Sequence, residues 1–396
     1  MVHLPFSLVR SHFTIMSEAD ISSPRRRGWF RFTLRTLLLA TFLVALAASY
    51  MGYHVARVGR EREVAAEIRA AGGETLYCYQ VEQGLLDADP PGPWPIRWLF
   101  GDDIFAAVQD VSYSYDPLAN DEALTRLQEL AELRGLRLYG EGFTDGGVDE
   151  VLKTRNLQAI SLGDTAITPA GLGRLSQLPQ LEHLTLSGSS VTDDHAVQLS
   201  SFSHLESLQL VRTSVTDEGL AAVGTITGLR SLQLQLAPGV SDSGIAALAP
   251  LRNLETFFLL GTSISDESLR TIGELRNLRF LFLWEKAVTD AGVVHLERLH
   301  ALETLNLRGT QVGDEGIAVV RGMPRLDHLS INETAVTDAG LMKLHGLKAL
   351  SVLEVTLGEG VTAEGVDGLK AHLPGCTVRC WERNPITGNT FLISDR

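Results

Sequence analysis

Histidine and cysteine are the residue types whose spacing most often reveals a reactive or metal-binding site, and here their spacing reveals none. His295 and His300 are five residues apart in a predicted helix, so they do not share a face as metal ligands at i and i+4 would. Cys376 and Cys380 are four residues apart in a predicted strand, which separates them by roughly 13 Å at ~3.3 Å per residue, too far for a disulfide. Residues 140–147 are rich in glycine but lack phosphate-binding spacing, and no nucleotide-loop, serine-hydrolase, zinc-protease or paired CxxC motif is present. We therefore predict a protein that is not an enzyme, with no catalytic residue, no cofactor and no metal ion.

Aromatic residues at alternate positions offer a different chemistry, the recognition of another protein. Phe258 and Leu260 form one such segment, and Phe280, Phe282 and Trp284 form the next. Exposed apolar patches usually mark interaction sites, and aromatic side chains beside an arginine have the composition of a binding hot spot. The predicted partner-binding residues are Phe258, Leu260, Phe280, Phe282, Trp284, Asn306 and Arg308. Alternatively, Phe280 or Phe282 folds onto its neighbour, or an adjacent loop covers the patch.

A repeat that fills most of the chain must position these residues. Its units open at Leu133, Leu157, Leu181, Leu205, Leu229, Leu254, Leu278, Leu302, Leu326 and Leu350, and a degenerate unit opens at Val108. The leucines are 24 residues apart, except for one interval of 25 between Leu229 and Leu254. Self-similarity at such a period is the signature of a protein that grows by stacking its units.

Each unit predicts a short strand, a turn and a helix. Leu208 and Leu210 are two residues apart and face one side of a strand, whereas the apolar spacing becomes three from Leu220 onward, which is the helical period. One unit cannot bury both apolar faces, but stacked neighbours can. The residues that alternate with the strand leucines point away from this core, which places the predicted partner-binding residues on neighbouring strands about 4.8 Å apart.

A Thr-Asp or Ser-Asp pair stands where each predicted helix begins, as in Thr216-Asp217. Such side chains accept hydrogen bonds from the free first-turn amides, and a carboxylate suits the positive end of the helix dipole. The pair recurs at Thr192-Asp193, Ser241-Asp242, Ser265-Asp266, Thr289-Asp290 and Thr337-Asp338, so we interpret it as structural. The hydroxyls of Thr213, Thr262, Thr310 and Thr334 are expected to bond turn backbone between neighbouring units.

Over residues 108–373, the pattern L-x-x-L-x-L-x-x-T/S-x-V-T-D-x-G-L resembles the leucine-rich-repeat family. The V-T-D-x-G-L helix entry is similar to that of F-box leucine-rich proteins and of bacterial proteins with comparable arrays, but no F-box-like helical segment precedes the repeats. The resemblance implies an α/β solenoid with a curved parallel sheet on its concave side, helices on its convex side and ligands bound on the concave face. We expect one transmembrane helix before it.

The expected transmembrane helix is the uncharged, mostly apolar run from Leu37 to Tyr53, which with its flanks over 32–56 reaches the ~20 residues that a bilayer core requires. Five arginines precede it within 25–35, and the three that follow are diluted by glutamates, so the positive-inside rule predicts a cytoplasmic N-terminus and extracytoplasmic repeats. The small-x-small sequence at 45–47 leaves open a cleaved signal peptide. Met16 is an alternative start.

The predicted organisation has five segments. They are a basic tail (1–31), the transmembrane helix (32–56), a juxtamembrane helix and N-terminal cap (57–105), a solenoid of about ten to eleven units (106–373), and a C-terminal cap strand with a tail (374–396). Within the N-terminal cap we expect a polar helix over 60–71 and a strand over 74–81. Trp94 and Trp98 either seal the first unit or contact a membrane surface. The final strand is expected over 371–381 and a tail over 382–396.

Charge narrows the class of partner. Residues 1–60 carry eight arginines against Glu18 and Asp20, a net charge of +6. Because the whole chain has a net charge of −14, the remaining residues carry −20. An acidic body disfavours nucleic acid, whose phosphates it would repel. The sequence therefore predicts a membrane-anchored module that binds a protein on the concave face, with the bilayer as its second partner. The alternatives are a recognition subunit of a larger enzyme complex and a structural envelope protein.

Overall fold

The computed structural model describes residues 34–83, 89–92, 94, 97–98, 101, 104, 106–116, 118–383 and 390–395. The chain divides into two compact units, Met1–Tyr53 and His54–Arg396. The predicted basic tail over 1–31 lies outside the described residues, as do the first two residues of the predicted membrane segment and parts of the predicted N-terminal cap and C-terminal tail.

The larger unit is built on one continuous sheet, in which each strand pairs with the next strand along the chain. Its strands are β1 (Gly73–Tyr77), β2 (Val108–Ser114), β3 (Gly135–Tyr139), β4 (Ala159–Gly163), β5 (His183–Ser187), β6 (Ser207–Val211), β7 (Ser231–Gln235), β8 (Thr256–Leu260), β9 (Phe280–Trp284), β10 (Thr304–Asn306), β11 (His328–Ile331), β12 (Val352–Leu357), β13 (Thr377–Arg383) and β14 (Thr390–Asp395). From β2 to β13 the pairing is parallel, whereas β1 and β14 pair antiparallel at the two ends.

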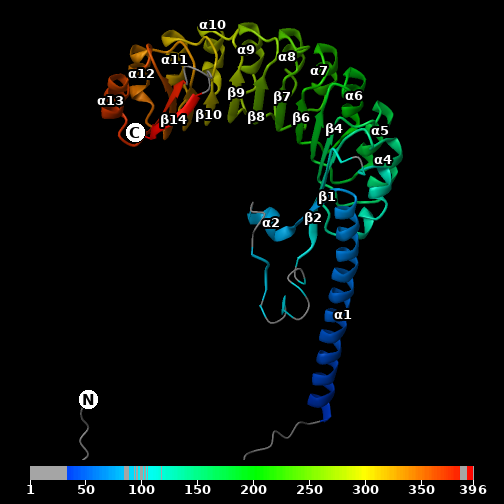
Figure 1. Cartoon of the computed structure of the whole chain (residues 1–396). Helices are drawn as coiled ribbons and strands as arrows, with labels where there is room; N and C mark the ends of the chain where they lie inside the picture. Colours follow the sequence, from blue (N-terminus) through cyan, green and yellow to red (C-terminus); the bar gives the residue numbers. More distant parts are fainter. Residues whose placement is uncertain are drawn as a thin grey trace, which may run out of the picture. The chain divides into compact units, whose positions relative to one another are not determined.

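A helix follows most strands and returns the chain to the start of the next one. The helices are α1 (Leu34–Ala70), α2 (Cys78–Gln83), α4 (Asp145–Val151), α5 (Pro169–Arg174), α6 (Asp193–Gln198), α7 (Asp217–Val223), α8 (Asp242–Ala247), α9 (Asp266–Ile272), α10 (Asp290–Val293), α11 (Asp314–Val319), α12 (Asp338–Lys343) and α13 (Ala363–His372). Within the solenoid, the strands line the inner side of an arc and helices α4 to α13 its outer side (Figure 1). The predicted fold class, a solenoid with a concave sheet and convex helices, is confirmed.

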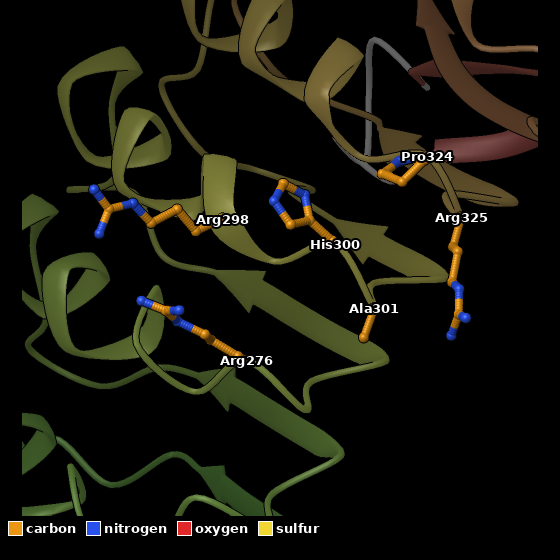
Figure 2. Close-up of a pocket in the computed structure, with 6 residues that line it drawn as sticks. All are labelled: Arg276, Arg298, His300, Ala301, Pro324 and Arg325. Carbon is orange, nitrogen blue, oxygen red and sulfur yellow. The ribbon is translucent and has the colours of Figure 1, made fainter.

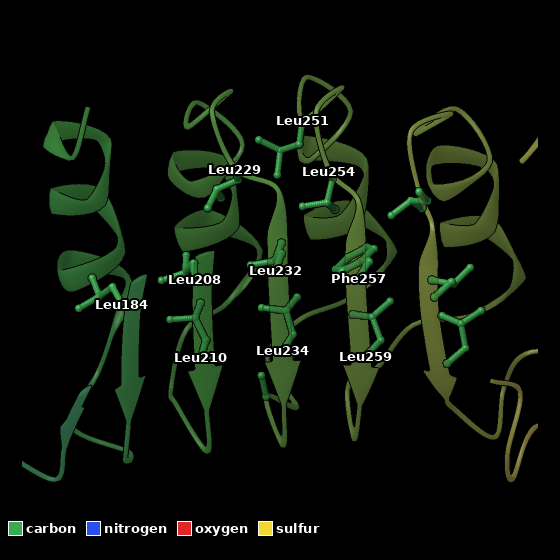
Figure 3. Close-up of a cluster of buried hydrophobic side chains, with 14 of the residues drawn as sticks. Leu184, Leu208, Leu210, Leu229, Leu232, Leu234, Leu251, Leu254, Phe257 and Leu259 are labelled. Carbon is green, nitrogen blue, oxygen red and sulfur yellow. The ribbon is translucent and has the colours of Figure 1, made fainter. Parts of the chain in front are cut away.

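The core lies between the sheet and the helices, where the repeated leucines meet. Leu232 pairs with Phe257 across β7 and β8, Phe257 pairs with Leu281 on β9, and all three are fully buried. Figure 3 shows Leu232 and Phe257 stacked along the array, with Leu208, Leu210, Leu234 and Leu259 in the same layer. Because burying one such side chain contributes about 1.5–3 kcal/mol, and every unit repeats the contact, the apolar face of each unit is stabilised by its neighbours.

The aspartate of each Thr-Asp pair lies in the first turn of its own helix and also accepts hydrogen bonds from the next unit. Thr216 accepts a hydrogen bond from the amide of Glu218 and so caps its own helix, whereas Asp217 accepts bonds from the amide and the hydroxyl of Ser241, at 2.7 and 2.5 Å. We call this series the aspartate ladder. Its pairs are Asp121–Thr144, Asp145–Thr168, Asp193–Thr216, Asp217–Ser241, Asp242–Ser265, Asp266–Thr289, Asp314–Thr337 and Asp338–Thr362.

The ladder also explains the glycine of the V-T-D-x-G-L motif. A Cβ atom at Gly219 would lie 2.4 Å from Oδ1 of Asp193, so the carboxylate of the preceding unit occupies the space that a side chain would need. In one unit Pro169 takes the aspartate position, so that unit has no such carboxylate. The unit that follows it carries His195 in place of the glycine. The position that faces a ladder aspartate therefore takes glycine or, at Ser268, a small side chain whose hydroxyl bonds to Asp242.

The turn threonines behave differently from expectation. Thr310 donates to the carbonyl of Leu307 at 2.7 Å, and Thr334 to that of Ile331 at 2.8 Å, so both hydroxyls close a turn within their own unit. Thr262 alone of the three reaches the next unit, through a side-chain carboxylate. The expected bonds to turn backbone of neighbouring units are therefore wrong for all four threonines. Thr310 and Thr334 bond a carbonyl three residues back, and Thr262 bonds a carboxylate. The buried Thr213 hydroxyl has no hydrogen-bond partner among the described residues.

Helix α1 joins two segments that the sequence suggested were separate. It runs unbroken from Leu34 to Ala70, so the polar helix expected over 60–71 is its C-terminal part. The apolar side chains before Tyr53 are largely exposed, whereas Val64 and Ile68 are buried in the solenoid core. Among the described residues, α1 is the one helix long and apolar enough to cross a membrane.

Both ends of the sheet differ in detail from the predicted caps. The strand expected over 74–81 ends at Tyr77, because the side chain of Gln80 accepts a hydrogen bond from the Tyr77 amide and the chain turns into α2. At the other end, β13 begins at Thr377, after α13 has continued to His372. The tail expected over 382–396 is wrong for 390–395, which form β14 and pair with β13.

Candidate protein-binding site

The predicted partner-binding residues lie together on the inner face of the sheet. Phe258 pairs with Phe282, and Leu260 with Trp284, across the parallel strands β8 and β9. They alternate with buried residues such as Phe257 and so face away from the core. Phe280 begins β9, and Asn306 and Arg308 follow at the equivalent positions of β10 and the residues after it.

The aromatic side chains touch one another and remain half-buried. The Phe258 ring lies 5.5 Å from that of Phe282 and 5.3 Å from that of Trp284, in tilted and edge-to-face arrangements. Aromatic pairs of this kind contribute about 0.5–1.5 kcal/mol beyond the area they bury. The alternative of neighbours folding onto one another is therefore partly realised, yet part of each ring stays accessible. We call Phe258, Phe282 and Trp284 the aromatic patch.

Polar contacts hold the Trp284 ring in place. Its indole Nε1 donates to Oδ1 of Asn306 at 2.9 Å, and the same oxygen accepts from the Arg308 amide at 3.0 Å. The Arg308 guanidinium lies 5.9 Å from the indole centroid and donates to Glu333 at 2.8 Å. The cation, the amide and the ring thus form one preorganised group, whose orientation does not have to be fixed when a partner binds.

The C-terminal strand reaches this group, which the sequence did not indicate. Arg308 also donates to the hydroxyl of Thr390, the first residue of β14, at 3.0 Å. These two residues are 82 positions apart. A periodic pattern contains no information about such a contact, because Thr390 lies outside the repeats.

Glu285 is the point where the regular geometry of the units breaks. Leu236, Gly261 and Gly309 hold the equivalent turn position in neighbouring units and have positive φ values of 52°, 66° and 73°, but Glu285 at that position does not. Its buried carboxylate turns back to the preceding unit, where it accepts from the amide and the hydroxyl of Thr262 at 2.8 and 2.9 Å. Burial raises the pKa of Glu285, and the hydrogen bonds from Thr262 and Gly261 oppose that rise only in part.

Replacing Glu285 with glutamine is expected to raise the melting temperature relative to the wild type, by an amount that grows as pH rises. A glutamate whose folded pKa lies above its unfolded pKa stabilises the fold most at low pH, and it loses that contribution as pH rises through the folded pKa. The glutamine oxygen can accept the same bonds without titrating. The difference in melting temperature, Gln minus Glu, should therefore grow from about pH 4 to about pH 8.

Thermal unfolding followed by circular dichroism measures this difference, with the same substitution at the exposed Glu359 as a matched control. A Glu285→Gln protein that is less stable throughout, or whose advantage shrinks with rising pH, would contradict this account of the buried carboxylate.

Sequence reasoning missed a second aromatic pair on the sheet. Tyr115 and Tyr139 lie 5.7 Å apart between their ring centroids, near the N-terminal end of the solenoid. The Tyr115 hydroxyl donates to Asp164 at 2.7 Å, which raises the pKa of that tyrosine. The signal was hidden because the unit that opens at Val108 is degenerate. Among the described residues, no group of three or more His, Cys, Asp or Glu side chains is arranged to hold a metal ion.

Comparison with known proteins gives the same architecture. A family model described as a leucine-rich repeat matches residues 203–224 and 298–320. Among solved structures, an internalin of Listeria monocytogenes, InlF, is similar over 68% of this chain and 86% of its own, with 18% identity and a TM-score of 0.50. Internalin C2 of the same organism matches over 60% of this chain and 84% of its own, with 20% identity and a TM-score of 0.33. No curated protein sequence matches the chain. The likeness to InlF supports the fold alone.

Proposed function

We propose that this leucine-rich-repeat protein is a non-catalytic binding module that holds another protein against the aromatic patch on the inner face of its sheet. The observation that carries the proposal is the cluster of Phe258, Phe282 and Trp284, half-buried and braced by Arg308. On the preceding strand β7, the equivalent positions carry the polar residues Ser231, Gln233 and Gln235.

The geometry of the patch favours binding for two reasons. The indole nitrogen of Trp284 already bonds to Asn306 and one guanidinium nitrogen of Arg308 to Glu333, so these donors stay paired when a partner covers them. The rings also hold one another, so little side-chain entropy remains to be lost on association. Aromatic and arginine side chains are the types that dominate the energetics of protein interfaces.

We propose further that the N-terminal part of α1 anchors the protein in a membrane, with the N-terminus in the cytoplasm and the repeats on the other side. The support is the exposed apolar stretch of α1 and the arginines on its N-terminal side. Cleavage as a signal peptide is the alternative. The intact mass of the purified mature protein distinguishes the two, because cleavage after Ala47 would remove the first 47 residues.

The binding proposal is tested by affinity capture from detergent-solubilised membranes with the full-length chain as bait. Three forms are compared: the wild type, Phe282→Asp with Trp284→Asp, and Tyr115→Asp with Tyr139→Asp. The tyrosine pair is a matched control, because it is also aromatic and lies at the other end of the same sheet. Circular dichroism establishes that each form is folded.

The proposal predicts one specific protein that is captured by the wild type and the tyrosine variant and lost from the aromatic-patch variant. If all three forms capture the same proteins, or none captures any, the aromatic patch is packing. A structural role through lateral contacts then becomes the better interpretation. A catalytic subunit captured in the same complex would favour the role of a recognition subunit.

A further inference from the structure

A basic pocket lies at the edge of the sheet where β9, β10 and β11 begin. It has a volume of about 690 Å³ and is lined by Arg276, Arg298, His300, Ala301, Pro324 and Arg325 (Figure 2). These residues come from three successive units, each just before or at the leucine that opens a strand. Every ionisable side chain that lines the pocket is therefore basic, although the chain after its first 60 residues carries a net charge of −20.

The arginines of the pocket are poorly neutralised. Arg276 lies 3.7 Å from Glu274, a weak exposed ion pair. Within the described residues, neither Arg298 nor Arg325 has a carboxylate within the 4.0 Å of an ion pair. Figure 2 shows the side chains of Arg276 and Arg298 directed to the same side, whereas Arg325 points away from them. Two like charges that face one space are unfavourable unless an anion lies between them.

His300 also lines the pocket, with its ring held by the backbone. Its Nδ1 lies 3.3 Å from the carbonyl oxygen of Gly322, a contact that orients the ring. Because Nδ1 then carries the proton of the neutral ring, Nε2 can donate to an anion only when the ring is protonated. Ala301 and Pro324 supply apolar surface between the charged side chains.

Basic residues are more frequent on this edge in the units that carry the aromatic patch and in those beside them than in the early units. Two residues before the opening leucine, the early units have Ala131, Arg155, Pro179, Ser203 and Thr227, whereas the later units have Arg252, Arg276, His300, Pro324 and Lys348. Arg279 joins the two surfaces, because it follows Arg276 in the chain and its guanidinium lies 5.2 Å from the Phe280 ring centroid. One partner can therefore contact both the edge and the inner face.

We propose that the basic pocket binds the carboxylates of an acidic segment in the same protein partner. This inference rests on the proposed function and deepens it. Guanidinium groups bind carboxylates through two parallel hydrogen bonds, and Arg276 and Arg298 both line the pocket with such a group. Because neighbouring strands are about 4.8 Å apart, three units span about 10 Å, the length of three to four extended residues. A short run of aspartates or glutamates fits that span.

The probe for this proposal is a fluorescein-labelled hexaglutamate peptide, whose binding to the purified full-length chain in detergent is followed by fluorescence anisotropy at low salt. The pocket variant is Arg276→Glu with Arg298→Glu. The matched control is Arg134→Glu with Arg155→Glu, which changes the net charge equally at exposed positions on the same edge of earlier units. The pocket variant is expected to bind the peptide at least tenfold more weakly, and the control variant less than threefold.

Equal weakening by the two variants, or no binding to the wild type, overturns the proposal, because the effect is then general electrostatics or absent. Displacement of the peptide by inorganic phosphate at equal charge concentration also overturns it, since the pocket would then be a site for small oxyanions. The variant with Phe282→Asp and Trp284→Asp should keep its affinity for hexaglutamate. Protein capture therefore tests the aromatic-patch proposal, and peptide binding separately tests the basic-pocket proposal.

Discussion

Phe257→Ala is expected to lower the free energy of unfolding by about 3–5 kcal/mol, the range for removing a fully buried phenylalanine ring. Phe257 has no exposed surface and lies between Leu232 and Leu281 in the core, so its loss leaves a cavity that the neighbouring units cannot fill. Its neighbour Phe258 is the matched control. The two residues share a type and a strand but face opposite sides of the sheet.

Phe258→Ala removes ring contacts on the accessible face, so its cost in stability is expected to be smaller, about 1 kcal/mol. It should instead weaken the capture of the partner, which Phe257→Ala should not do at temperatures where it remains folded. Chemical denaturation followed by circular dichroism measures the first effect and affinity capture the second. Equal losses of stability in both variants would mean that Phe258 belongs to the core and not to a binding face.

The second large effect is expected from the aspartate ladder. Asp242 accepts bonds from the amide of Ser265 at 2.8 Å, from its hydroxyl at 2.6 Å, and from the amide of Ser268 at 3.1 Å. The Ser268 hydroxyl is a fourth donor. Asp242→Ala leaves all four without their acceptor. Because the site is partly accessible and water can replace some of these bonds, we expect a loss of about 1–3 kcal/mol in the free energy of unfolding.

Asp194→Ala is the control for that substitution. Asp194 also lies in the first turn of a helix but is exposed and binds no neighbouring unit, so its replacement should cost less than about 1 kcal/mol. Denaturant unfolding of both variants against the wild type measures the difference. Similar losses for Asp194→Ala and Asp242→Ala would show that helix-dipole interactions, and not bonds between units, account for the aspartates.

The pH dependence of the Asp242 effect has a definite sign. Burial by itself raises the pKa of Asp242, but the hydrogen bonds from Ser265 and Ser268 outweigh it and hold the pKa below the usual value. A carboxyl group with a depressed folded pKa contributes stability that is present above its unfolded pKa and is lost as pH falls through the folded pKa. The difference between wild type and Asp242→Ala should therefore be full at neutral pH and shrink in acid.

The sequence predicted the architecture well because the architecture is local and repeated. The spacing of Leu208 and Leu210, followed by the period of three from Leu220, defines one strand and one helix, and stacking follows because neither face can be buried alone. The same alternation placed Phe258 and Phe282 on the accessible face of neighbouring strands. These features depend on residues within a single unit or on its exact copy in the next.

What the sequence did not predict depends on contacts that the repeat does not encode. Asp217 was interpreted through its own helix, whereas its main partner is Ser241 of the next unit. The contact between Arg308 and Thr390 joins a repeat to a segment outside the array. Glu285 departs from the repeat pattern, but only the structure shows that its carboxylate is buried against Thr262.

Site-specific photocrosslinking tests the central claim most directly, that a protein binds the inner face at the aromatic patch. A photoreactive phenylalanine analogue replaces Gln233, which pairs with Phe258 across β7 and β8, and in a second protein it replaces Val294, which is 50% exposed and lies in the helical layer. We predict a crosslinked adduct of one specific protein from position 233, none from position 294, and loss of the first when Phe282→Asp and Trp284→Asp are added. Equal adducts from both positions, or an adduct at 233 that survives those two substitutions, would contradict the account.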